Sequence, residues 1–289
     1  MKKKLALLFF VCIAINFLFS QEENATLVRL ITSLESLTDN TQKVDTLNEI
    51  SFLYLFSDLE AAEKYALASD TLSKKIKYKT GIATSLVRLG TVEMYRYDYE
   101  KSEQYFNEAL KLRIEIGEPA NIARVYNNLG LVFKNAGKPL SAIDRYESGL
   151  EILNNIKNGL EEKKLQQQLA KMHNNTGSAY KSAGKFESAE YHLIKSVELR
   201  EQLDNPVNTA KSYMNLGSLY YEEEFLDTAK SNLYLTKSLN LSILNNRERG
   251  QAQCLVNLGN LFFYQDKYEE ALAYYEKAKE KSDYLKLDE

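Results

Sequence analysis

Hydrophobic residues recur along almost the whole chain at spacings of three and four, with polar residues between them. Such spacing places the hydrophobic side chains on one stripe of a helix. The stripes come in a repeating unit, which predicts two amphipathic helices joined by a short turn. Each of five units carries a glycine, and successive glycines are 40, 47, 40 and 42 residues apart: Gly90, Gly130, Gly177, Gly217 and Gly259.

The positions around each glycine are filled in a regular way. A large residue stands four before it, and in four of the five units an aromatic residue stands three after it. A small residue stands twelve after it, a bulky one sixteen after it, and a small one again nineteen after it. In the unit of Gly217, this register assigns the packing positions to Ala229, Leu233 and Thr236.

The recurring glycine indicates how closely the helices pack. Glycine inside a helix costs about 1 kcal/mol relative to alanine. Its repetition at one position therefore predicts that two helix backbones approach closely there, with small residues at the crossing. Self-similarity at a period of this length is typical of a solenoid, in which successive units stack in one dimension.

The pattern resembles the tetratricopeptide repeat family over nearly all of the chain after residue 41. The period near 40 resembles the branch that includes kinesin light chains and bacterial regulators. A degenerate copy precedes the five units, with Ser51 in place of the glycine, a turn two residues shorter, and packing positions at Ala61, Tyr65 and Ala68. The resemblance implies an all-α fold, an α-solenoid of about six antiparallel helix pairs forming a right-handed superhelix.

The predicted organisation is a signal peptide at 1–20, a lead-in at 21–41 and one repeat domain at 42–289. Its repeats are expected near residues 44–77, 83–116, 123–156, 170–203, 210–243 and 252–285. Pro119, Pro139 and Pro206 suit the first turn of a helix, where a missing N–H has no cost. The longest spacing comes from a polar segment that begins at Asn158, which we expect to add about two turns to the flanking helices.

The amino terminus predicts export. Three lysines precede a largely apolar run of 15 residues at 5–19, which is short for a membrane span. We expect cleavage after Ser20 and a periplasmic or extracytoplasmic location. An uncleaved anchor is the alternative, and lipoprotein processing at Cys12 is disfavoured because Val11 before it is large. After cleavage Cys254 is the only cysteine left, so no intramolecular disulfide is expected.

Composition argues against several functional classes. The formal net charge is −3, so nothing favours nucleic acid as a partner. Neither His173 nor His192 has acidic residues or cysteines at metal-ligand spacing, and no nucleophile motif or phosphate-binding glycine loop is present. We therefore expect no catalytic residue, no metal, no cofactor and no small-molecule substrate. Cys254 is interpreted as a small packing residue.

Asparagine precedes the Leu-Gly or Thr-Gly pair in four consecutive units, at Asn128, Asn175, Asn215 and Asn257, and Arg88 holds this position in the unit before. The family resemblance implies that this position faces the concave groove, where such asparagines hold a peptide main chain. A carboxamide has the donors and the acceptor to do so. The alternative is that the asparagines bond the neighbouring repeat and fix its stacking.

Cations stand on the same predicted face, six residues before or four after the glycine: Arg124, Lys134, Lys171, Lys181 and Lys211. An acidic peptide or a free carboxylate would suit them. The alternative is that they are ordinary solvated side chains. Toward both ends of the array, apolar or aromatic residues take these places and form candidate shelves for a ligand or a subunit: Met94, Tyr95, Tyr221, Phe263 and Tyr264.

These observations predict a non-catalytic scaffold that binds a protein or an extended peptide, acidic in one option. One hypothesis is an exported sensory or regulatory module, similar to the extracytoplasmic repeat region of bacterial sensor kinases. The other is a free-standing periplasmic assembly scaffold without signalling output. Membrane contact is expected only through an uncleaved signal segment or a missing C-terminal region.

Overall fold

The computed structural model describes residues 25–156 and 161–286. The described part is all-α, as predicted, and contains no strand. A helix at 25–34 is followed by α2 (Thr41–Tyr54), α3 (Leu59–Lys75), α4 (Lys79–Tyr95), α5 (Tyr99–Ile116), α6 (Pro119–Asn135), α7 (Pro139–Asn154), α8 (Glu162–Ser182), α9 (Phe186–Gln202), α10 (Pro206–Leu219), the 3₁₀ turn η1 (Glu223–Phe225), α11 (Thr228–Leu244), α12 (Glu248–Phe263) and α13 (Tyr268–Lys286).

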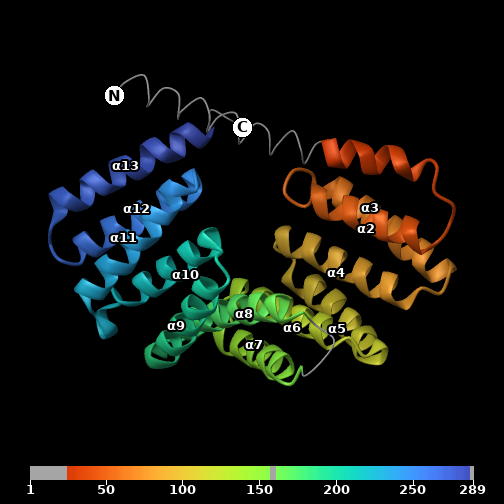
Figure 1. Ribbon diagram of the computed structural model, residues 1–289, viewed down its shortest axis with the longest axis horizontal. Coiled ribbons are helices and arrows are strands. Elements are labelled where there is room, and N and C mark those ends of the chain that lie inside the picture. The colour runs from red at the N-terminus through yellow and green to blue at the C-terminus, as the bar shows by residue number, and fades with distance from the viewer. Residues whose placement is uncertain (1–24, 157–160, 287–289) are drawn as a thin grey trace. The chain divides into compact units, whose positions relative to one another are not determined.

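The chain divides into two compact units, residues 1–136 (unit 1) and 137–289 (unit 2). In unit 1, α2 packs with α3 and α4 with α5, and α4 also contacts α2 and α6 (Figure 1). In unit 2, α8 packs with α9, α10 with α11 and α12 with α13, and α10 contacts both α8 and α12. Helix pairs therefore stack side by side within each unit, which is the predicted solenoid arrangement.

Local sequence explains where the helices begin. Asn40, Asp58 and Asp98 precede α2, α3 and α5, and each side chain accepts a hydrogen bond from a backbone N–H of the first turn. Such caps satisfy donors that have no partner inside the helix. The three prolines lie at the starts of α6, α7 and α10, as predicted.

The repeated glycines lie where helices of one pair cross closely. A Cβ on Gly177 would come within 2.7 Å of Leu193 Cγ and 3.0 Å of the Ala189 carbonyl oxygen. At Gly90 it would meet the ring of Phe106 at 3.0 Å. The predicted close approach is confirmed at both positions.

Buried serines pin each of three pairs to its neighbours. Ser196 Oγ on α9 donates to the Ala170 carbonyl of α8, 2.8 Å away, and lies 2.7 Å from Ser212 Oγ on α10. Two further pins have the same design, Ser69 with Ser85 and Ser238 with Cys254. Cys254 is buried and serves as a small packing residue, as expected.

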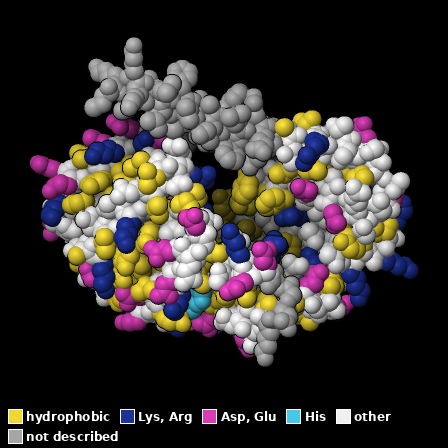
Figure 2. All heavy atoms as spheres, in the orientation of Figure 1, with side chains coloured by type: hydrophobic (Ala, Val, Ile, Leu, Met, Phe, Trp, Pro, Cys, Tyr) yellow, Lys and Arg dark blue, Asp and Glu magenta, His cyan; other side chains and the backbone are white. Residues whose placement is uncertain are grey.

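The predicted register of α11 is wrong. Ala229, Leu233 and Thr236 are exposed, while the buried positions are Ser231, Leu235 and Ser238. The shift is two residues because the turn between α10 and α11 is longer and contains η1. Figure 2 shows hydrophobic side chains at the surface over α11 to α13, and the exposed ones there include Leu233.

The degenerate first pair also differs by one residue from the prediction. The buried positions of α3 are Ala62, Ala66 and Ser69, not Ala61, Tyr65 and Ala68. Ser51 Oγ donates to the Ala62 carbonyl at 2.8 Å. Ala62 lies eleven residues after Ser51, against the twelve of the regular units, so the turn is one residue shorter than theirs, not two.

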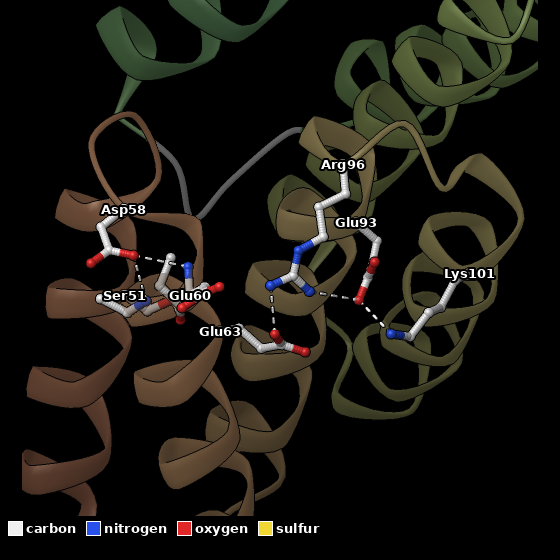
Figure 3. Close-up of polar contacts among 9 residues, drawn as sticks. Ser51, Asp58, Glu60, Glu63, Glu93, Arg96 and Lys101 are labelled. Carbon is white, nitrogen blue, oxygen red and sulfur yellow. Dashed lines mark hydrogen bonds and ion pairs between the residues drawn. The ribbon is translucent and has the colours of Figure 1, made fainter.

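Glu93 takes the place that an aromatic residue holds in the other four units. Its side chain is buried and pairs with Arg96 and Lys101, while Arg96 also reaches Glu63 at 2.7 Å (Figure 3). A buried carboxylate is tolerated only when it is paired. The network thereby ties α3, α4 and α5 together.

Two predicted features fall wholly or partly outside the described residues. The signal peptide at 1–20 lies outside the described residues, as do residues 157–160 of the long spacing. The helix that follows the latter, α8, has 21 residues against 17 in α6. Among the described helices, none has the length and apolar character needed to cross a membrane.

Candidate functional site

The predicted binding residues lie on the first helices of the pairs, α6 in unit 1 and α8, α10 and α12 in unit 2. Arg124 and Lys211 are exposed near the starts of α6 and α10, and Lys171 is exposed in the middle of the longer α8. They occupy equivalent positions, six residues before the glycine. Cations at these positions therefore remain accessible to a ligand.

Two of the predicted asparagines bond a neighbouring pair. Asn215 Nδ2 on α10 donates to Asn174 Oδ1 on α8, 2.9 Å away. Asn257 Oδ1 on α12 accepts from the Tyr221 hydroxyl at 3.1 Å. Part of the hydrogen-bonding capacity of both carboxamides is thus used in stacking.

The other two asparagines, Asn128 and Asn175, are half-buried and each follows another asparagine. Asn127 Nδ2 donates to Asn128 Oδ1, and Asn174 Nδ2 to Asn175 Oδ1, both at 3.4 Å. Sequence reasoning missed Asn127 and Asn174, although the two Asn-Asn dipeptides at equivalent positions are a visible signal.

The cations that follow the glycines are less accessible than those that precede them. Lys134 is half-buried, and burial lowers its pKa. Lys181 Nζ lies 2.8 Å from Glu222 Oε1 and donates to the carbonyl and hydroxyl oxygens of Ser218, both 3.1 Å away. Lys181 therefore already has a carboxylate partner.

The guanidinium of Arg88 on α4 has an unusual electrostatic environment. Its Nε donates to the Asn48 carbonyl oxygen of α2 at 3.1 Å, and its guanidinium lies 4.6 Å from the centroid of the Phe52 ring. Among the described residues, no carboxylate forms an ion pair with it. Burial, followed by repulsion from Arg124, lowers the pKa of Arg88 to about 10 against the opposing attraction of the Glu49 carboxylate, so it stays charged at neutral pH.

Asn48 beside it is also unusual. Its side chain is buried, and its Oδ1 and Nδ2 atoms have no hydrogen-bond partner in the described part of the protein. Buried polar atoms are nearly always paired, so such a carboxamide needs an explanation. Asn48 is 3% exposed, so its carboxamide is closed to a ligand, whereas the half-buried guanidinium of Arg88 is within reach of one.

Exposed aromatic side chains lie at the carboxyl-terminal ends of the same two helices, α2 and α4. Phe52 is 45% exposed, Phe56 75% and Tyr95 40%, and the rings of Phe56 and Tyr95 meet edge to face at 5.5 Å between centroids. Tyr95 was predicted as part of an apolar shelf. Phe52 and Phe56 were missed because the degenerate first pair was aligned only by its packing positions.

The two histidines of the chain meet in unit 2. His173 Nδ1 of α8 lies 2.9 Å from His192 Nδ1 of α9, and the Tyr180 ring stacks on His192. Burial lowers the pKa of His173 to about 4, and burial also lowers the pKa of His192. Within the described ranges, no group of three or more histidine, cysteine or acidic side chains is arranged to hold a metal.

Comparison with protein families gives one result over much of this architecture. The tetratricopeptide repeat family matches residues 81–155 and 209–281, which together make up just over half of the chain. The chain belongs to the tetratricopeptide repeat family. Comparison of this repeat protein with curated protein sequences finds no match.

Solved structures resemble the tetratricopeptide repeat chain at low identity. BtubC (BKLC) from P. vanneervenii has a TM-score of 0.67 and 22% identity, over 80% of this chain and 93% of that one. A Rap protein complexed with Competence and Sporulation Factor has a TM-score of 0.69 and 15% identity, over 94% and 74% of the two chains. The apo quorum sensor NprR from B. thuringiensis has a TM-score of 0.58 and 15% identity, over 92% and 84%. At such identities the likeness shows the fold alone.

Proposed function

We propose that this tetratricopeptide repeat protein is a non-catalytic scaffold that binds an extended, acidic peptide segment along the first helices of its pairs. The observation that carries the proposal is Arg88. A half-buried guanidinium with no carboxylate at ion-pair distance costs free energy. A ligand carboxylate would remove that cost, and the planar fork of arginine suits bidentate pairing.

The surroundings of Arg88 suit a peptide better than a free anion. The carboxamide of Asn48 beside it is closed to solvent, so the donors available to a ligand are those of the Arg88 guanidinium. The exposed rings of Phe56 and Tyr95 offer apolar surface for a side chain beside the carboxylate. Exposed Arg124 on the neighbouring α6 adds positive charge.

Cations in unit 2 support the proposal of an acidic ligand independently of Arg88. Exposed Lys171 and Lys211 lie on neighbouring helices, α8 and α10, and attract acidic groups at long range. Long-range attraction of this kind raises association rates more than it raises final affinity. Unit 2 is therefore proposed to offer a surface of its own for acidic segments, separate from the anchor at Arg88 in unit 1.

The test is direct binding of a defined probe. A fluorescein-labelled eight-residue peptide of alternating glutamate and alanine is titrated with the protein and followed by fluorescence anisotropy. The same peptide with glutamine in place of glutamate is the ligand control. We expect the acidic probe alone to bind, and Arg88→Gln to weaken it about tenfold.

The matched protein control is Arg29→Gln, which removes the same charge from an exposed position on the helix at 25–34. We expect this variant to bind like the native protein. Equal loss in both variants would mean that the probe senses only net charge, and the proposed anchor would be wrong.

We further propose that the protein acts outside the cytoplasm as a sensory or regulatory module, with an assembly scaffold as the alternative. The support is the amino-terminal sequence, with its lysines and its apolar run. Cell fractionation and the intact mass of the native protein test it. A mature chain that begins at Gln21 in the envelope fraction is expected, and a full-length chain confined to the cytoplasm would rule out export.

A further inference from the structure

Helix α10 ends earlier than its counterpart in the preceding pair. Relative to the repeated glycine, α8 continues five residues, to Ser182, whereas α10 stops two residues after Gly217, at Leu219. Residues 220–222 form a turn before η1, and Asp227 N donates to the Tyr220 carbonyl at 2.8 Å. The longer α10–α11 turn thus gives residues 220–222 a non-helical path.

The segment 218–222 surrounds the ammonium group of Lys181. The Ser218 carbonyl and hydroxyl oxygens accept from Lys181 Nζ, and the Glu222 carboxylate pairs with it. The ring of Tyr221 completes the site, with Nζ 5.4 Å from its centroid. A cation predicted to serve an acidic ligand is therefore bound by the protein's own carboxylate.

The same segment also holds a second predicted ligand-binding residue. The Tyr221 hydroxyl donates to Asn257 Oδ1, and the Tyr221 ring stacks on Tyr264 at 5.9 Å between centroids. One short stretch of α10 and its turn thereby occupies Lys181 of α8 and Asn257 of α12 at once. In this respect it imitates an acidic peptide lying across the three helices.

We propose that Glu222 is an internal competitor, whose carboxylate holds Lys181 until an acidic ligand displaces it. The proposal rests on the proposed function and adds its regulation: the 218–222 segment sets how acidic a peptide must be to bind unit 2. The competition is specific because a ligand carboxylate and the Glu222 carboxylate bind the same ammonium group, that of Lys181.

The contact is weak enough to be exchanged. The side chains of Lys181 and Glu222 are 25% and 35% exposed, so water reaches both. Ion pairs this open contribute little net stability. A ligand that brings several carboxylates gains additional pairing at exposed Lys211 of α10, which the single Glu222 does not supply.

The test compares Glu222→Gln with Glu223→Gln, using the glutamate–alanine probe peptide. Both variants lose one negative charge, but Glu223 is an exposed residue of η1. We expect Glu222→Gln to tighten binding of the probe about two- to fivefold, with Glu223→Gln unchanged. Helical content and the melting temperature of each variant are measured alongside.

A double-mutant cycle with Lys181→Gln makes the result specific. With Lys181 removed, Glu222→Gln is expected to give no gain. An equal gain in Glu222→Gln and Glu223→Gln, no gain in either, or a gain that survives Lys181→Gln would each overturn internal competition. If the native protein and all variants leave the probe unbound, the proposed function itself is wrong, which is a different and recognisable outcome.

Discussion

Arg88 in unit 1 and Asn215 in unit 2 hold the same place in their repeats, two residues before the glycine, yet they use their donors differently. Asn215 donates to Asn174 of the preceding first helix. Arg88 makes one bond to a backbone carbonyl and leaves its positive charge without a carboxylate. One position has become a stacking contact in unit 2 and an unsatisfied cation in unit 1.

The difference shows how a repeat separates stability from recognition. A side chain whose donors and acceptors are met inside the protein stabilises the stack and has little left for a ligand. A side chain held in place by a ring and a carbonyl, as Arg88 is by Phe52 and Asn48, is ordered but unpaired. Recognition is therefore expected where pairing is incomplete.

The largest effect expected concerns the glycine crossings of the two units. Gly177→Ala forces a Cβ against Leu193 and the fixed carbonyl of Ala189, whereas Gly90→Ala meets only ring atoms of Phe106. Overpacking of this kind costs about 1–3 kcal/mol. We expect the free energy of unfolding to fall by about 3 kcal/mol in Gly177→Ala and by about 1 kcal/mol in Gly90→Ala. Urea unfolding followed by circular dichroism measures both values.

Both variants gain the same helix propensity, so their difference isolates the packing. An equal loss in the two, or a larger loss at Gly90, would mean that the backbone contact in unit 2 relaxes easily. The structural difference between the two glycine crossings would then have no effect on the free energy of unfolding.

A second prediction sets stability against binding at the equivalent positions. Arg88→Gln removes a half-buried charge that has no ion-pair partner and is expected to raise the melting temperature by about 2 °C. Asn215→Ala leaves Asn174 Oδ1 without its donor at 2.9 Å and is expected to lower the melting temperature by about 3 °C. Differential scanning calorimetry of the two variants checks the signs, and a decrease for Arg88→Gln would show that the guanidinium stabilises the native unit.

The smallest expected effect is a pH dependence confined to unit 2, which contains both histidines. An unfolded histidine has a pKa near 6.5, and the folded pKa of His173 is lowered to about 4. The unfolded state thus binds more protons than the folded state. The contribution of neutral His173 to the free energy of unfolding is therefore complete above pH 6.5 and is lost as the pH falls toward 4. Near the pair, Lys195 favours the neutral form of His173, whereas Glu147 favours the charged form of His192.

Hydrogen exchange at pH 7 and pH 6, corrected for the intrinsic rate, measures the change. We expect protection of α8 and α9 to fall about threefold more than protection of α4 and α5. His173→Leu is expected to remove the difference. A uniform loss in both units would assign the acid sensitivity to carboxylates.

Periodicity alone predicted the helix pairs and their close crossings, because glycine and small residues at helical spacing leave few other arrangements. It did not predict the α11 register, since two additional residues in a turn leave the spacing within each helix unchanged. The roles of Arg88 and Lys181 were also beyond the sequence. Whether a cation meets a carboxylate depends on residues about 40 positions away, such as Glu222 for Lys181.

The buried serine pins have a consequence for how such an array changes in evolution. In the pins Ser69–Ser85, Ser196–Ser212 and Ser238–Cys254, the partners are 16 residues apart and belong to successive pairs. Deletion of the single period between the last two pins would set Ser196 opposite Cys254, again two small polar groups, so no hydroxyl would lose its partner there. Elsewhere the equivalent positions are apolar, as at Ala109 and Val125, and deletion of that period would leave Ser69 opposite Val125 without a polar partner.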